Sequence, residues 1–72
     1  MKIDFADLKA RILSMFGSYR AFAAALGVSV GTLNRWLNNK TSMPMDALYR
    51  MVDLLLIPDA EVNYFFFRRL EA

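Results

Sequence analysis

The side chains able to do chemistry in this 72-residue sequence are carboxylates, basic groups, hydroxyls and amides, because the chain contains no His and no Cys. Their absence excludes a zinc finger, a Ser–His or His–Cys nucleophile pair and a thiol redox centre built by this chain alone. No glycine-rich loop that would cradle a phosphate is present either. The acids form no acid/base pair visible in the sequence: Asp4, Asp7, Asp46, Asp53, Asp59, Glu61 and Glu71. We therefore expect no enzymatic activity, no metal, no cofactor and no small-molecule ligand.

The basic residues are distributed unevenly, although the net charge is only +2. Between Asp7 and Asp46 the sequence has no acid, and residues 8–45 carry a charge of +5. The basic residues in that segment are Lys9, Arg11, Arg20, Arg35 and Lys40. The rest of the chain has four basic residues against seven acids, which gives −3. This separation is typical of a protein that turns one face toward a polyanion, and the competing interpretation is chance clustering in a short chain.

The elements that must position these groups are helices. Apolar residues recur at helical spacing along the chain, and no segment alternates with the period of two that a strand requires. The expected helices cover residues 4–16, 18–26, 29–37, 44–57 and 59–64. The sequence therefore predicts an all-α domain over residues 1–72, a compact bundle of about five short helices.

Single residues are predicted to set the ends of these helices. Gly17 suits the C-terminal cap of the first helix, and the hydroxyls of Ser18 and Ser29 suit the starts of the second and third. Gly27 readily takes the positive φ that a sharp turn requires. Pro44 stands where a proline is tolerated in the first turn of a helix.

The segment over residues 19–40 has the spacing of a helix-turn-helix: a short helix, a turn over residues 26–29 and a second short helix. Ala23 is small enough for two steeply crossed helices to approach each other. We expect Leu33 and Trp36 on the second helix to pack back into the core. Small, glycine and large apolar residues thus occur together in the pattern that this motif requires.

On these residues the chain resembles the lambda repressor-like helix-turn-helix domains of Cro and CI repressors, and most closely their short phage-type members. Together with Leu8 and Ile12, the residues behind the resemblance are Phe16-Gly17-Ser18, Ala21-Phe22-Ala23, Leu26-Gly27-Val28-Ser29, Thr32-Leu33, Leu37-Asn38-Asn39-Lys40, Ile57-Pro58 and Tyr64-Phe65-Phe66. They extend over nearly the whole chain. The resemblance implies a five-helix bundle whose third helix enters the major groove of double-stranded DNA.

The resemblance also assigns roles to residues in and around the third helix. The base-facing positions are Val30, Gly31, Asn34 and Arg35, with Asn38 at the margin. The candidate phosphate contacts are Tyr19, Arg20, Ser29, Thr32, Asn39, Lys40 and Thr41. Val30 and Gly31 depart from the family pattern, which commonly has Gln or another polar residue there. Base discrimination is therefore expected to shift to Arg35, which favours guanine, and Asn34, which favours adenine.

Several of these residues have a second interpretation that the sequence leaves open. Val30, three residues before Leu33, is either a groove contact or the edge of the core. Arg35 is either a base-reading side chain or an ordinary solvated charge. Tyr19 is either a phosphate contact or a surface residue at the start of a helix. Trp36 lies on the side opposite Arg35, so we expect it in the core.

The C-terminal aromatic residues amount to more apolar surface than one small domain hides, and such patches usually mark an interface. Some of them must close the core of the chain itself. The remainder predicts a two-fold homodimer that would set two recognition helices about one turn of DNA, ~34 Å, apart. The residues expected at this interface are Tyr64, Phe65, Phe66, Phe67 and Leu70.

Two functions from different classes follow. The first is a sequence-specific transcriptional regulator, a phage or prophage repressor that occupies an operator, with an antitoxin-like autoregulator as a variant. The second is a protein–protein interaction module that keeps the scaffold but has lost base readout. Val30, Gly31 and the aromatic C-terminus favour the second, whereas the charge separation argues against it. The sequence has no signal peptide and no long apolar run, so we expect a cytoplasmic protein with no membrane partner.

Overall fold

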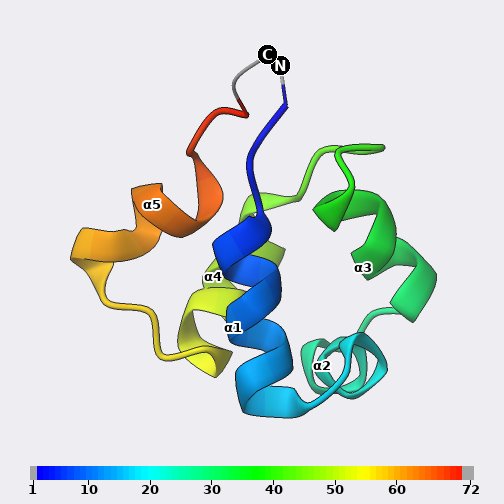
Figure 1. Cartoon of the computed structure of the whole chain (residues 1–72). Coiled ribbons are helices and arrows are strands. Elements are labelled where there is room, and N and C mark those ends of the chain that lie inside the picture. The colour runs from blue at the N-terminus through cyan, green and yellow to red at the C-terminus, as the bar shows by residue number, and fades with distance from the viewer. Residues whose placement is uncertain (1, 71–72) are drawn as a thin grey trace.

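The computed structural model describes residues 2–70, in which helices surround one hydrophobic core (Figure 1). The elements are α1 (Ala6–Phe16), α2 (Tyr19–Leu26), α3 (Val30–Leu37), α4 (Met45–Leu54), the 3-10 helix η1 (Asp59–Glu61) and α5 (Val62–Phe66). Within residues 2–70 no strand forms, and β pairing is limited to an isolated bridge between Ile3 and Arg69. The predicted all-α bundle is confirmed. Glu71, one of the acids considered above, lies outside the described residues.

The core joins all five α-helices. α1 stands in the middle, with α2 and α3 on one side, α5 on the other and α4 behind it (Figure 1). The largest fully buried side chains are Phe22, Leu8, Ile12, Leu26, Leu33, Met51 and Leu55. Each such side chain contributes about 1.5–3 kcal/mol through the apolar surface it removes from water. Trp36 is 8% exposed and belongs to the same core, as its position on α3 predicted.

The predicted caps are present at the end of α1, at both ends of α2 and at the start of α3. Gly17 and Gly27 adopt left-handed backbone conformations, with φ of 82° and 87°. The hydroxyl oxygen of Ser18 accepts a hydrogen bond from the third backbone amide of α2 at 3.1 Å. The hydroxyl oxygen of Ser29 accepts the amide of Thr32 in α3, also at 3.1 Å. The turn between α2 and α3 is therefore specified by local residues.

Several helix boundaries differ from those expected, and α4 ends at Leu54 instead of residue 57. α1 begins at Ala6 instead of Asp4, because the carboxylate of Asp4 accepts the Ala6 amide at 3.0 Å and thereby stands outside the helix. Pro44 is the residue before α4 and has an extended backbone, with ψ of 148°. The last helical segment is divided into η1 and α5, and it continues past Tyr64 to Phe66.

The N-terminal segment is held on both sides. Two backbone hydrogen bonds of 2.7 and 3.0 Å join residues 2–4 to residues 68–70. On the other side the amide of Asn39 accepts the N–H of Ile3 and donates to its carbonyl, both at 2.9 Å. The segment therefore connects the end of α5 to the loop that follows α3. None of the helices described is long and apolar enough to cross a membrane.

Candidate functional site

α2 and α3 pack against each other and are joined by residues 27–29. A side chain from α4 contacts the last residue of α2, just before this turn. Nη1 of Arg50 donates a hydrogen bond to the Leu26 carbonyl at 2.8 Å. That carbonyl is at the C-terminal end of α2, where a cation is favourable. Sequence periodicity did not single out Arg50, because its partner lies 24 residues away. The orientation of α3 is thus fixed by the turn and by α4.

α3 divides into a buried side and an exposed side. Leu33, Trp36 and Leu37 are buried, whereas Asn34 and Arg35 are exposed. Val30 is half-buried and packs against the core, so the structure gives it the core-edge position that the sequence had left open.

The exposed hydroxyls at the start of α3 form a short hydrogen-bonded chain. Ser29 Oγ donates to Thr32 Oγ1 at 2.9 Å. The same Thr32 oxygen accepts Nη2 of Arg35 at 3.1 Å. The guanidinium of Arg35 therefore turns back along α3 toward its N-terminus. Gly31 is exposed beside it, and a Cβ at that position would lie 3.8 Å from Nη1 of Arg35.

The two asparagines after α3 have different environments. Asn38 is exposed; its Nδ2 donates to the Asn34 carbonyl at 2.9 Å, and its Oδ1 accepts Nζ of Lys9 at 3.5 Å. Lys9 belongs to α1, so tertiary structure adds a cation to the end of α3 that helical spacing did not predict. Asn39, by contrast, is half-buried and uses both its oxygen and its nitrogen on Ile3. This corrects the prediction of a phosphate contact at Asn39, since its amide fastens the N-terminal segment.

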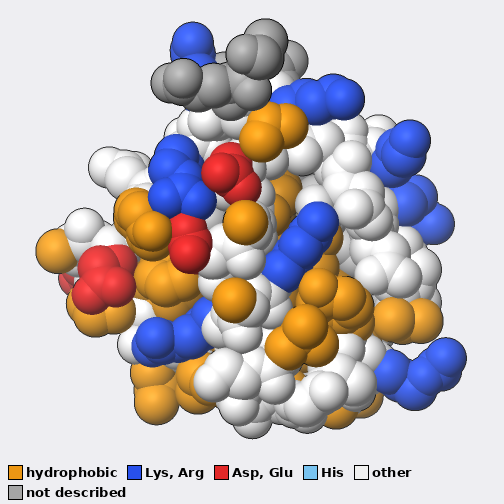
Figure 2. All heavy atoms as spheres, in the orientation of Figure 1, with side chains coloured by type: hydrophobic (Ala, Val, Ile, Leu, Met, Phe, Trp, Pro, Cys, Tyr) orange, Lys and Arg blue, Asp and Glu red, His pale blue; other side chains and the backbone are white. Residues whose placement is uncertain are grey.

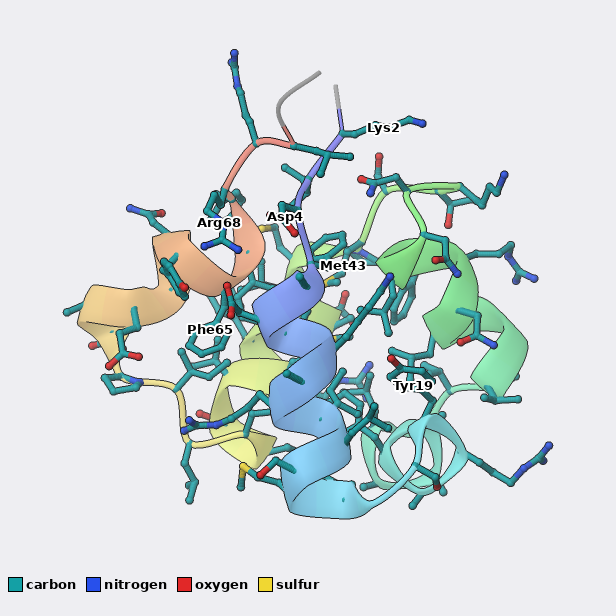
Figure 3. All side chains as sticks on the ribbon, in the orientation of Figure 1. Lys2, Asp4, Tyr19, Met43, Phe65 and Arg68 are labelled. Atoms are coloured by element: carbon teal, nitrogen blue, oxygen red, sulfur yellow. The ribbon has the colours of Figure 1, made fainter. Side chains whose placement is uncertain are left out.

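The remaining predicted phosphate contacts separate into free and packed side chains. Arg20 on α2 is exposed, as are Lys40 and Thr41 in the loop after α3. Tyr19 is half-buried against the core, and it lies between α1 and α3 in the view of Figure 3. Its ring therefore supports the start of α2, which leaves the basic and hydroxyl groups of the other three as the accessible donors.

The charge separation seen in the sequence is partly preserved in space. On the face drawn in Figure 2, acidic side chains gather over α5 and the start of α1, while the side formed by α2 and α3 shows Lys and Arg. α2 and α3 themselves contain no acid. This side of the molecule, with Lys9, Arg20, Arg35 and Lys40, is called the basic side below.

Arg11 does not belong to the basic side. Its Nε donates to the Leu55 carbonyl at 3.1 Å, and its Nη2 donates to the Leu56 carbonyl at 3.2 Å. The guanidinium also lies over the ring of Phe65, 5.8 Å from its centroid. Arg11 therefore satisfies carbonyls at the end of α4. Four of the five basic residues between positions 8 and 45 remain on the basic side.

Two acids at the start of α1 form ion pairs with an arginine of the C-terminal segment. Arg68 pairs with Asp4 at 3.2 Å and with Asp7, and its guanidinium lies 4.5 Å from the ring centroid of Tyr64 (Figure 3). Hydrogen bonds from Tyr64 and Arg68, with the positive charge of Arg68, hold the pKa of Asp7 below its usual value. Both carboxylates at the start of α1 are thus paired with Arg68 from the C-terminal segment.

The predicted interface residues of the C-terminal segment are divided between core and surface. Phe65 and Phe66 are buried in the chain itself, with 7% and 3% exposure, so they are corrected from interface residues to core residues. The remaining three stay exposed: Tyr64, Phe67 and Leu70. α5 has only five residues, and both of its phenylalanines are buried in the hydrophobic core. Five large exposed apolar residues outside the predicted patch also emerge: Leu13, Met15, Met45, Tyr49 and Leu56.

The sequence of residues 1–69 matches a family model described as Protein of unknown function (DUF739). The chain belongs to this family. No curated protein matches the sequence. The matched range includes every helix of this DUF739 member and all the residues of its basic side.

A hollow of about 390 Å³ lies beside the loop between α3 and α4 of this DUF739 member. Its walls include Trp36, Met43 and Phe66, and the one charged side chain among its lining residues is Lys40. Among residues 2–70, no carboxylate lines this hollow. Within residues 2–70, no cluster of three or more His, Cys, Asp or Glu is placed to hold a metal.

Proposed function

We propose that this chain is a sequence-specific DNA-binding regulator that inserts α3 into the major groove. In this proposal α2, the turn and α3 are a helix-turn-helix of the lambda repressor-like type. The observation that carries it is the division of α3: its apolar side is buried, while Asn34 and Arg35 project from an acid-free helix. The serine cap and the left-handed Gly27 support the same assignment.

In the proposed complex the basic groups around α3 hold the phosphates. Arg20 precedes the turn and Lys40 follows α3, so phosphate contacts lie on both sides of the recognition helix. Lys9 adds a third cation near Asn38. Three to five phosphate contacts predict that the logarithm of affinity falls with the logarithm of salt at a slope of about −3 to −5.

Base discrimination in this proposal depends on two side chains. Arg35 presents a planar guanidinium that suits the O6 and N7 atoms of guanine, and Asn34 presents an amide that suits adenine. Each matched contact is worth about 1–3 kcal/mol of discrimination. Gly31 contributes no hydrogen bond but allows close approach of the α3 backbone to the groove.

The regulator is proposed to act as a two-fold homodimer. Tyr64, Phe67 and Leu70 are the exposed apolar residues of the C-terminal segment, at 49%, 47% and 52% exposure. A dimer doubles the number of phosphate and base contacts, and its symmetry matches a palindromic operator. Occupying the operator would block transcription.

A second candidate function, a protein–protein interaction module, is favoured by the apolar residues on and after α4. Tyr49 is 62% exposed and Leu56 is 71% exposed. A contact through these side chains would be apolar, so its affinity would be insensitive to salt. The salt slope therefore separates this function from DNA binding.

The direct test is selection of bound duplexes from a randomised DNA pool by the purified full chain at about 100 mM salt. We expect an enriched palindrome with half-sites centred about 10 base pairs apart. The matched control is Arg69→Ala, which removes the same charge as Arg35→Ala but from the C-terminal segment. Failure to retain any duplex, with the protein shown to be folded, would contradict the proposed function.

A further inference from the structure

We propose that Thr32 is a specificity-determining positioning residue whose hydroxyl orients the guanidinium of Arg35 for guanine, in a space left open by Gly31. The inference rests on the proposed function and adds to it. The resemblance assigns Thr32 a phosphate contact, whereas its hydrogen bonds in the structure link it to Arg35.

The first step is the bonding of the Thr32 hydroxyl. Its oxygen accepts Oγ of Ser29 at 2.9 Å and Nη2 of Arg35 at 3.1 Å, so both acceptor positions of the hydroxyl are occupied. Ser29 is itself fixed, because it accepts the Thr32 backbone amide at 3.1 Å. The guanidinium is thereby tied through two hydroxyls to the capped first turn of α3.

The second step is the consequence for Arg35. An exposed arginine samples many rotamers and loses this freedom when it contacts a base. A hydrogen bond that already holds the side chain in one orientation lowers the ordering cost of binding. Nη2 alone is engaged by Thr32, so Nε, Nη1 and the second Nη2 proton remain to donate. Two parallel N–H groups are what the O6 and N7 atoms of guanine accept.

The third step is the role of Gly31. Glycine inside a helix is less favourable than alanine, and the backbone at Gly31 has no positive φ that would require it. A Cβ at this position would lie 3.8 Å from Nη1 of Arg35 and 3.9 Å from Oγ of Ser29. Alanine therefore fits, but a longer side chain would compete with the guanidinium for space. Gly31, which departs from the family pattern, thus leaves space for Arg35. In this proposal Arg35 makes the base contact that a polar side chain at position 31 would otherwise make.

The test compares matched variants on duplexes that carry each base in turn at the guanine position of the selected half-site. Thr32→Val keeps the shape and removes the hydroxyl, and Thr32→Ser keeps the hydroxyl. We expect the wild type to prefer guanine by about 5- to 150-fold, Thr32→Val by less than about threefold, and Thr32→Ser to restore the preference. Gly31→Gln leaves the hydroxyl chain in place and should abolish the guanine preference through steric competition.

The outcomes distinguish the positioning role from other roles of Thr32. A structural role would lower the thermal stability of Thr32→Val without changing the ratio among bases. A phosphate contact would lower its affinity for all duplexes by the same factor. Either result, with the guanine preference intact, overturns the inference and leaves the proposed function standing. If the folded wild type binds no duplex, the proposed function itself fails.

Discussion

Asn39 and Ile3 form a reciprocal pair of hydrogen bonds: the Asn39 amide oxygen accepts the Ile3 N–H, and its nitrogen donates to the Ile3 carbonyl, both at 2.9 Å. The pair joins residues 36 positions apart. It fixes the N-terminal segment against the loop that directly follows α3. The position of Lys40 and Thr41, the exposed donors of that loop, therefore depends on a side chain that is hydrogen-bonded to the N-terminal segment.

Substitution of Asn39 tests this connection. Asn39→Ala leaves two backbone groups of Ile3 without partners and places alanine at a φ of 60°. We expect the free energy of unfolding to fall by about 2 kcal/mol, within the range for unsatisfied polar groups. Asn39→Gly is the matched control, because glycine accepts the positive φ and loses only the hydrogen bonds. Urea denaturation measures the free energy of unfolding of both variants. A decrease below about 0.5 kcal/mol in Asn39→Ala would contradict a stabilising role for the Asn39–Ile3 hydrogen bonds.

Two arginines with the same formal charge are expected to behave differently. Arg11→Ala removes the donors to the Leu55 and Leu56 carbonyls and should lower the free energy of unfolding by about 1–2 kcal/mol without changing the salt slope of DNA binding. Arg20→Ala should leave stability unchanged and reduce the salt slope by about one. Thermal melting and salt titration distinguish the two. A salt slope lowered in Arg11→Ala would place its guanidinium at the DNA.

The ion pairs at the start of α1 predict a dependence of stability on acid. The pKa of Asp7 is lowered in the folded protein from an ordinary value of 3.8, chiefly by hydrogen bonding from Tyr64 and then by Arg68. A carboxyl group with a lowered pKa stabilises the fold above its unfolded pKa, and this contribution is lost as pH falls through the folded pKa.

Asp7→Asn should therefore lower the free energy of unfolding at pH 7 and flatten its decline below about pH 4. Asp53→Asn is the control, because no ion pair of Asp53 is present among the described residues. Chemical denaturation at a series of pH values measures both slopes. If the free energy of unfolding of Asp7→Asn fell as steeply below about pH 4 as that of the wild type, Asp7 would be excluded as a source of acid sensitivity.

The C-terminal residues provide a paired test of core and interface. Phe66→Ala removes a ring that is 3% exposed and should cost about 3–5 kcal/mol, a large part of the stability of a small domain. Phe67→Glu alters a ring that is 47% exposed and should leave the fold intact while dissociating the proposed dimer. Light scattering at micromolar concentration measures the molar mass of each variant in solution. Tyr49→Glu on α4 is the control surface, and dissociation by that variant would move the interface to α4.

The parts of the structure that local sequence specifies were predictable. Gly27 and Ser29 determine the turn before α3 through neighbouring residues, and the spacing of Leu33 and Trp36 identifies its buried side. The roles of Arg11 and Asn39 were not predictable, because their partners lie 44 and 36 residues away in the chain. A basic residue or an asparagine looks the same in the sequence whether it faces solvent or satisfies a distant carbonyl.

The division of the C-terminal aromatic residues has a similar cause. Phe65, Phe66 and Phe67 are adjacent, so their order in the chain gives no indication of which will face α1. In the structure Phe67 directly follows α5 and remains exposed, while residues 68–70 bond to the N-terminal segment. Hydrophobic spacing in the sequence does not encode such tertiary contacts. For this reason the sequence could not show that Phe65 and Phe66, two of the predicted interface residues, are buried in the core.

The central claim, that α3 reads DNA sequence, is tested most directly by Arg35→Ala on two duplexes: the selected sequence and a scrambled one of the same composition. We expect affinity for the selected duplex to fall by about 1–3 kcal/mol, or about 5- to 150-fold, with a far smaller loss on the scrambled duplex. Arg69→Ala should change the affinity for neither duplex. Equal losses on the two duplexes would reduce Arg35 to a nonspecific charge and contradict sequence readout by α3.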